Sequence, residues 1–182
     1  MKSIFVFMLA LLSATTVASA QGKVNLKIST ERQQKVSAAI KQQGKYGSDD
    51  VKSSTIYVHP TVRETTQDVS YLIKIQNMGP AATGLVVKYT LFARDRATQQ
   101  IEATVQDQQT VDIKSLQTQS MKTKSAQFSA TTAQYTDGFK DRKQGSESAG
   151  IGVAVYFGNT RVATCYDPPG LERQAAKINS GL

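Results

Sequence analysis

The chain carries one histidine, His59, and one cysteine, Cys165, so few residues are available for catalysis. Any nucleophilic site that uses a Ser–His or Cys–His pair would have to include His59. No serine lies in a Gly-x-Ser-x-Gly motif. A single histidine and a single cysteine also cannot supply the four nitrogen and sulfur ligands of a structural zinc site. We therefore expect no catalytic residue, no metal site and no cofactor.

Both residues have simple structural interpretations. His59 precedes Pro60 and is expected to be a half-exposed residue of a strand. Cys165 lies in an apolar stretch and is expected to be a small, half-buried strand residue. An intermolecular disulfide or a reactive thiol is the alternative for Cys165.

The most suggestive group for binding is Phe139, Lys140, Arg142 and Lys143. An aromatic ring beside three cations can bind an anionic sugar or a protein surface. The group falls in 131–149, which shows no periodicity and is expected to be a long loop. An ordinary solvated loop is the alternative interpretation.

The first 20 residues have the order of a secretory signal peptide. Lys2 is followed by the apolar run Ile4–Leu12, and Ala18–Ala20 has the small-x-small cleavage pattern. Cleavage is expected between Ala20 and Gln21. No cysteine follows the cleavage point, so we expect a periplasmic or extracellular protein that is not a lipoprotein. The apolar run is too short to cross a bilayer, and the mature chain is expected to have no transmembrane segment.

The chain is basic, with 22 Lys and Arg against 14 Asp and Glu and a net charge of +8. This balance favours anionic partners such as an envelope polysaccharide or an acidic protein, although it also serves solubility. Export removes the usual nucleic-acid targets, so we expect no nucleic-acid partner.

The patterning predicts strands through most of the chain. Alternation of apolar and polar residues indicates strands over Val24–Ile28, 69–76, 84–93 and 150–166, the last a hairpin with its turn at Gly158-Asn159. Weaker strand signals occupy 55–62, 101–105, 111–113 and 116–130.

Helix signals are scarce. Residues 30–43 are compatible with a short helix capped by Thr30, or with an extended or mobile segment. Residues 171–177 follow Pro168-Pro169-Gly170 and are expected to form one or two helical turns. A second long loop is expected over 43–54.

Seven or so short strands with turns between them predict an all-β fold, an antiparallel β-sandwich with little helix. The segments SYLIKIQNMGP, GLVVKYTLFARD and GIGVAVYFGNTRV resemble those of small exported bacterial proteins with an immunoglobulin-like or fibronectin III-like domain. The chain has no Trp and no cysteine pair, so it does not match the antibody type. The resemblance implies an architecture and a binding role, and it transfers no active site.

We divide the chain into a signal peptide (1–20), an N-terminal strand with a mobile basic segment (21–53), a β-sandwich domain (54–170) and a short C-terminal tail (171–182). The expected function is non-catalytic binding or scaffolding at the bacterial cell envelope, with exposed edge strands open to a partner chain. A module that binds carbohydrate or an anionic envelope polymer is the alternative, and a secreted hydrolase is a third, weaker hypothesis.

Overall fold

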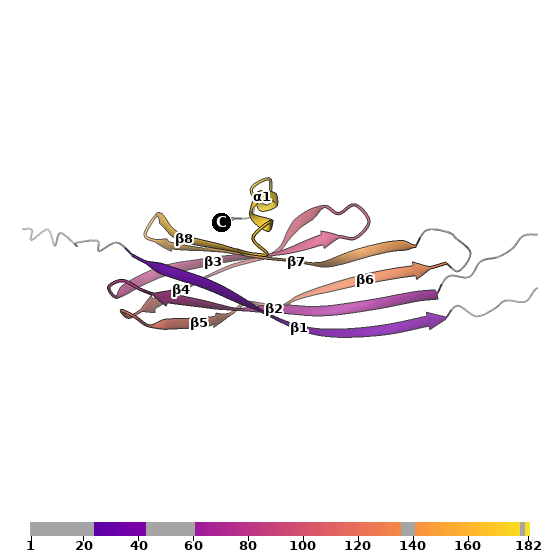
Figure 1. The fold of residues 1–182 in the computed structure, drawn as a ribbon, viewed down its shortest axis with the longest axis horizontal. Helices are drawn as coiled ribbons and strands as arrows, with labels where there is room; N and C mark the ends of the chain where they lie inside the picture. The colour runs from indigo at the N-terminus through magenta and orange to yellow at the C-terminus, as the bar shows by residue number, and fades with distance from the viewer. Residues whose placement is uncertain (1–23, 43–60, 136–140, 179–180) are drawn as a thin grey trace, which may run out of the picture.

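The computed structural model describes residues 24–42, 61–135, 141–178 and 181–182, and these residues form an almost entirely β structure (Figure 1). The elements, in chain order, are β1 (Leu26–Gln42), β2 (Thr61–Asn77), β3 (Ala82–Asp95), β4 (Ile101–Ile113), β5 (Thr118–Lys122), β6 (Ala126–Gln134), β7 (Arg142–Phe157), β8 (Thr160–Asp167) and the short helix α1 (Leu171–Ala175). Every strand pairing is antiparallel, which confirms the predicted all-β antiparallel class.

The strands form two sheets that are joined through β7. In the first sheet β1 pairs with β2, and β2 pairs with both β5 and β6. In the second sheet the order is β4-β3-β7-β8. The long strand β7 pairs with β6 at its start and with β3 and β8 further along, so it passes from one sheet to the other.

Strands β5 and β6 lie end to end along the same edge of β2, as two parts of one interrupted strand. β5 pairs with residues 72–76 of β2, and β6 pairs with residues 61–69. Between them, Thr123 Oγ1 accepts a hydrogen bond from the Tyr71 N–H at 2.9 Å, and the Thr123 N–H donates to the Tyr71 carbonyl at 2.9 Å. If β5 and β6 are counted as one interrupted strand, the two sheets contain seven strands, which agrees with the seven or so that the sequence predicted.

The core lies between the two sheets and follows the predicted alternation. Val69, Tyr71, Ile73 and Ile75 of β2 are buried on one face. They pack against buried residues of the opposite sheet, chiefly Leu85, Val87, Tyr89, Leu91, Ile151, Val153 and Val155. Burial of these apolar side chains is the main favourable contribution to folding.

A second, smaller core covers part of the outer face of the second sheet. Phe92 and Ala149 pack there against Leu171 and Ala175 of α1. This packing confirms that β3 is covered on both faces near Phe92. It also explains why α1 forms directly after β8, where the sequence predicted one or two helical turns.

The predicted hairpin is confirmed, because β7 and β8 are joined at Gly158-Asn159 and Gly158 has φ +57°. Of the two alternatives left open for residues 30–43, the structure shows the extended one, since β1 runs through to Gln42. One prediction was wrong. Most of 131–149 is not a loop, since β6 continues to Gln134 and β7 begins at Arg142. The predicted loop 43–54 lies outside the described residues.

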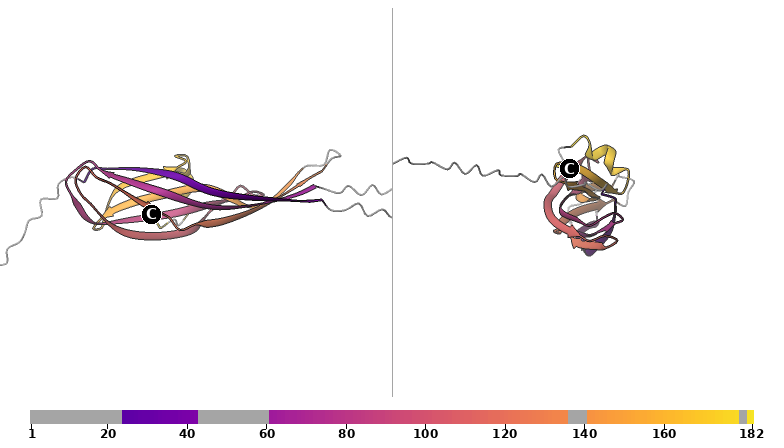
Figure 2. Two further views of the ribbon diagram at one scale, coloured as in Figure 1. Left: turned by 90° about the horizontal axis from the view of Figure 1, so that it is seen from below. Right: turned by 90° about the vertical axis from the view of Figure 1, so that its left-hand side faces the viewer.

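The ambiguity over 30–43 and the error over 131–149 have one physical cause, which is visible in Figure 2. The first sheet and the start of β7 continue beyond the two-layered body as a single layer of four strands. We call this layer the arm, and it comprises residues 35–42, 61–68, 129–134 and 142–145. Because solvent reaches both faces of a single layer, its strands need no alternation of apolar and polar residues.

Candidate functional site

The arm presents an unpaired strand edge. β1 lies at the end of the strand order and, within the described residues, pairs with β2 alone. All side chains from Glu31 to Ile40 are exposed. An edge of this kind offers backbone N–H and C=O groups to another extended chain.

The face of the arm that continues from the core is both apolar and basic. The pairing register places Ile40 opposite Arg63, Arg63 opposite Thr132, and Thr132 opposite Lys143, so the four share one face. Val36 belongs to the same face of β1. The exposed fractions of Val36 and Ile40 are 50% and 67%, which is high for β-branched apolar residues.

Of the predicted basic group, Arg142 and Lys143 lie within the described residues, and both belong to a strand rather than to a loop. Arg142 and Lys143 are successive residues of β7, so their exposed side chains point to opposite faces of the arm. Phe139 and Lys140 lie outside the described residues, as do His59, Ala20 and Gln21.

Cys165 occupies the predicted position in β8, opposite Val153 of β7, and is half-buried. Burial, and secondly the charge of Asp167, raises the pKa of the Cys165 thiol. A raised pKa reduces the thiolate fraction, which is the opposite of what a catalytic cysteine needs.

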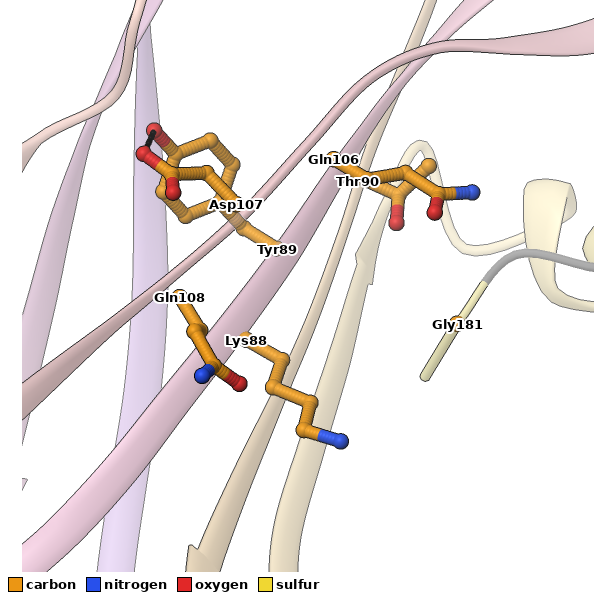
Figure 3. Close-up of a pocket in the computed structure, with 7 residues that line it drawn as sticks. All are labelled: Lys88, Tyr89, Thr90, Gln106, Asp107, Gln108 and Gly181. Atoms are coloured by element: carbon orange, nitrogen blue, oxygen red, sulfur yellow. Dashed lines mark hydrogen bonds between the residues drawn. The ribbon is translucent and has the colours of Figure 1, made fainter.

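The second sheet carries a polar network around Tyr89 (Figure 3). The Tyr89 hydroxyl donates to Asp107 Oδ2 at 3.2 Å and accepts from the Lys124 N–H at 2.9 Å. Lys124 Nζ also lies 3.1 Å from Asp107 Oδ2. Burial raises the pKa of Tyr89, and the hydrogen bond from Lys124 lowers the pKa of Asp107. Lys124 follows β5 of the first sheet, whereas Tyr89 and Asp107 belong to the second, so the network links the two sheets. Each of its polar groups has a hydrogen-bond or ionic partner within the network.

A hollow of about 300 Å³ lies on the outer face of the second sheet, where Lys88 and Gln108 project, and it is lined by Lys88, Tyr89, Thr90, Gln106, Asp107, Gln108 and Gly181. Figure 3 shows Tyr89 and Asp107 bonded to each other at one side, while Lys88 and Gln108 project together from neighbouring strands. No sequence pattern indicated this hollow, because its lining depends on the register between β3 and β4 and on the approach of the distant Gly181.

The described residues hold no group of three or more His, Cys, Asp or Glu that could bind a metal ion. Over the same part of the chain, no helix has the length and apolar character needed to cross a membrane.

No protein-family model and no curated protein sequence matches this chain. Among solved structures, a crystal structure from Akkermansia muciniphila matches at 11% identity over 81% of this chain and 74% of that chain, with a TM-score of 0.24. Similarity at this level says nothing about the function of either protein.

Proposed function

We propose that this protein is a non-catalytic, exported binding or scaffolding module of the bacterial cell envelope, and that it binds an extended segment of a partner protein along β1. The observation that carries the proposal is the arm. Its outer strand is exposed on both faces from Glu31 to Ile40, and β1 pairs with no described strand on its other edge.

The energetics of strand addition support this role. A partner strand gains main-chain hydrogen bonds from the edge and specificity from alternate side chains. On one face of β1 it would cover Val36 and Ile40, which the chain otherwise leaves in water. Soluble proteins rarely leave large apolar side chains exposed along a strand edge, so Val36 and Ile40 indicate an interaction surface.

We also propose that the body is an immunoglobulin-like sandwich. Immunoglobulin domains place strands A, B and E in one sheet and C, F and G in the other. If β1, β2 and β6 stand for A, B and E, then β3, β7 and β8 stand for C, F and G. Such frameworks serve as rigid supports for binding surfaces, and they imply no particular chemistry.

The proposal is tested by capture from a solubilised envelope fraction at low and high salt. We expect the wild-type chain to retain one protein at high salt, and the Val36→Lys/Ile40→Lys variant to lose it, because lysines on an edge strand oppose pairing. Ser115→Lys, in an exposed turn outside the arm, is the matched control and should behave as the wild type.

Hydrogen exchange of the complex supplies the second measurement. The backbone amides of residues 31–40 should exchange more slowly when the partner is bound, because pairing protects them. Equal capture by the double-lysine variant, or no change in exchange along β1, would overturn the proposal. Pairing between two copies of this chain would also contradict it, and light scattering would reveal that as a dimer.

A further inference from the structure

A second candidate surface lies on the body, away from the arm, and is independent of β1. The hollow beside Lys88 adjoins another of about 340 Å³, which is lined by Val86, Lys88, Gln108, Tyr156, Gly158 and Asn159. Both hollows contain Lys88 and Gln108. Together they form one groove, which we call the outer groove, running from Gly181 to the β7–β8 turn.

The pairing register explains why these side chains meet. Lys88 lies opposite Gln108 of β4, and its neighbour on the same face, Val86, lies opposite Tyr156 of β7. Lys88 alternates with the buried residues Val87 and Tyr89, so it projects to the outer face. The consecutive strands β3 and β4 and the distant strand β7 therefore supply one lining.

The lining combines an aromatic ring, a cation and side-chain amides. Lys88 Nζ lies 4.9 Å from the centre of the Tyr156 ring, and Arg161 of β8 is paired opposite Tyr156. Gln108 and Asn159 are exposed beside them. Among the described lining residues the one carboxylate is Asp107, which Lys124 and Tyr89 already engage. The groove is therefore basic as well as polar.

We propose that the outer groove binds an anionic oligosaccharide, a sugar chain that carries carboxylate groups. The apolar face of a sugar ring packs against Tyr156 in place of Lys88 Nζ, because Tyr156 has an apolar body and a polar tip. The amides of Gln108 and Asn159 each offer donors and an acceptor, as a sugar hydroxyl also does. Lys88 supplies a point charge for the carboxylate.

The backbone beneath the outer groove favours a sugar ligand rather than a peptide that would add to the sheet as a strand. β3 and β7 both lie inside the sheet, each paired on two sides, so their main-chain groups are used within the sheet. A peptide could not add to them as a strand. Recognition is left to the side chains, whose chemistry suits a polyhydroxylated ligand with negative charge.

The test is calorimetric titration of the full chain with an oligogalacturonate, with an uncharged malto-oligosaccharide of equal length for comparison. We expect binding of the charged sugar that weakens with salt, and at least tenfold weaker binding of the uncharged one. Lys88→Gln should reduce affinity roughly tenfold, the value typical of a hydrogen bond to a charged group. Tyr156→Ala should reduce it further, whereas Tyr156→Phe keeps the ring and should retain most of the affinity.

Arg142→Gln is the matched control, because it removes one positive charge from the exposed start of β7. The Val36→Lys/Ile40→Lys variant separates this proposal from the strand-addition proposal, since it should bind the sugar as the wild type does. No binding of the charged sugar, unchanged affinity in Lys88→Gln and Tyr156→Ala, or an equal loss in Arg142→Gln would each overturn the assignment. Thermal unfolding of every variant confirms that it is folded.

Discussion

The amide nitrogen of Asn77 donates a hydrogen bond to the carbonyl oxygen of Pro80 at 2.6 Å, which closes the turn between the two sheets. The Asn77 side chain is fully buried, and its oxygen accepts from the Gly79 N–H at 2.9 Å. The same amide nitrogen reaches the carbonyl oxygen of Ile113 at 3.4 Å. One side chain thus holds the end of β2 to the start of β3 and the end of β4.

Replacing this residue, as Asn77→Ala, should lower the free energy of unfolding by about 2–4 kcal/mol, because buried carbonyl groups lose their donor. Urea denaturation measures the change. Asn25→Ala removes an exposed side chain of the same type and should change stability by less than about 0.5 kcal/mol. Equal effects of the two substitutions would contradict the role given to Asn77.

Isoleucines on β1 and β2 should differ sharply in their contribution to stability. Ile73 is fully buried, whereas Ile40 is 67% exposed on the arm. We expect Ile73→Ala to cost about 2–5 kcal/mol, through lost burial and the cavity left behind. Ile40→Ala should cost less than about 0.5 kcal/mol. A large loss for Ile40→Ala, measured by denaturant unfolding, would mean that the arm is packed in solution.

Alanine substitutions at Gly150 and Gly158, which both have positive φ, should differ in how much they destabilise the fold. One adds a steric clash to the cost of the backbone conformation, and the other does not. A Cβ on Gly150 would collide with the Asp167 carbonyl oxygen and lie 2.7 Å from Pro168 Cδ, whereas a Cβ on Gly158 would meet nothing. Gly150→Ala should therefore destabilise strongly, and Gly158→Ala by only about 1 kcal/mol. Melting temperatures that fall equally for the two variants would refute this assignment.

The decrease in the free energy of unfolding at acid pH should depend on Asp107. The hydrogen bond from Lys124 lowers the Asp107 pKa below its ordinary value of 3.8. A carboxyl group with a lowered folded pKa contributes stability above its ordinary pKa and loses it as the pH falls through the folded pKa. Asp107→Asn should flatten the fall in stability below about pH 4. Unfolding measured between pH 2 and 7 tests this, and an unchanged profile would count against it.

Asp95 should also contribute to the decrease in stability at acid pH, so its effect can be compared with that of Asp107. The Thr98 backbone N–H donates to Asp95 and lowers its pKa. The acid dependence should therefore shrink in Asp107→Asn without disappearing, because Asp95 still titrates.

Cys165 should react slowly in the native protein. Burial raises its thiol pKa above the ordinary value of 9.0, so the thiolate is scarcer at pH 8 than in an unfolded chain. Alkylation by iodoacetamide, followed by mass spectrometry, should be slower in buffer than in urea. Equal rates would show that Cys165 is accessible and ionises normally.

Much of the body could be predicted from the sequence. The alternation at Val69, Tyr71, Ile73 and Ile75 predicted a strand with one buried face, and all four residues are buried. The Gly158-Asn159 hairpin and the helical turns after Gly170 were also readable. These features arise from local rules, namely the period of a strand, the φ of a turn and the stop made by proline.

The arm could not be predicted in the same way. Residues 30–43 were compatible with either a helix or an extended segment, and 131–149 had no periodicity, yet both regions contain strands. A strand with solvent on both faces has no buried side to impose alternation. The Thr-rich segments of β2 and β6 were the available signal, because β-branched residues favour extended backbone.

The sequence by itself determined the antiparallel all-β class, the residues of the core and the scarcity of catalytic groups, because these follow from composition and from contacts along single strands. Only the tertiary structure decided that β1 is an exposed edge, that Arg142 and Lys143 point apart, and that Lys88, Gln108 and Tyr156 line one groove. Each of these depends on which strands pair and in which register. That choice comes from packing between segments far apart in the chain, which no local pattern encodes.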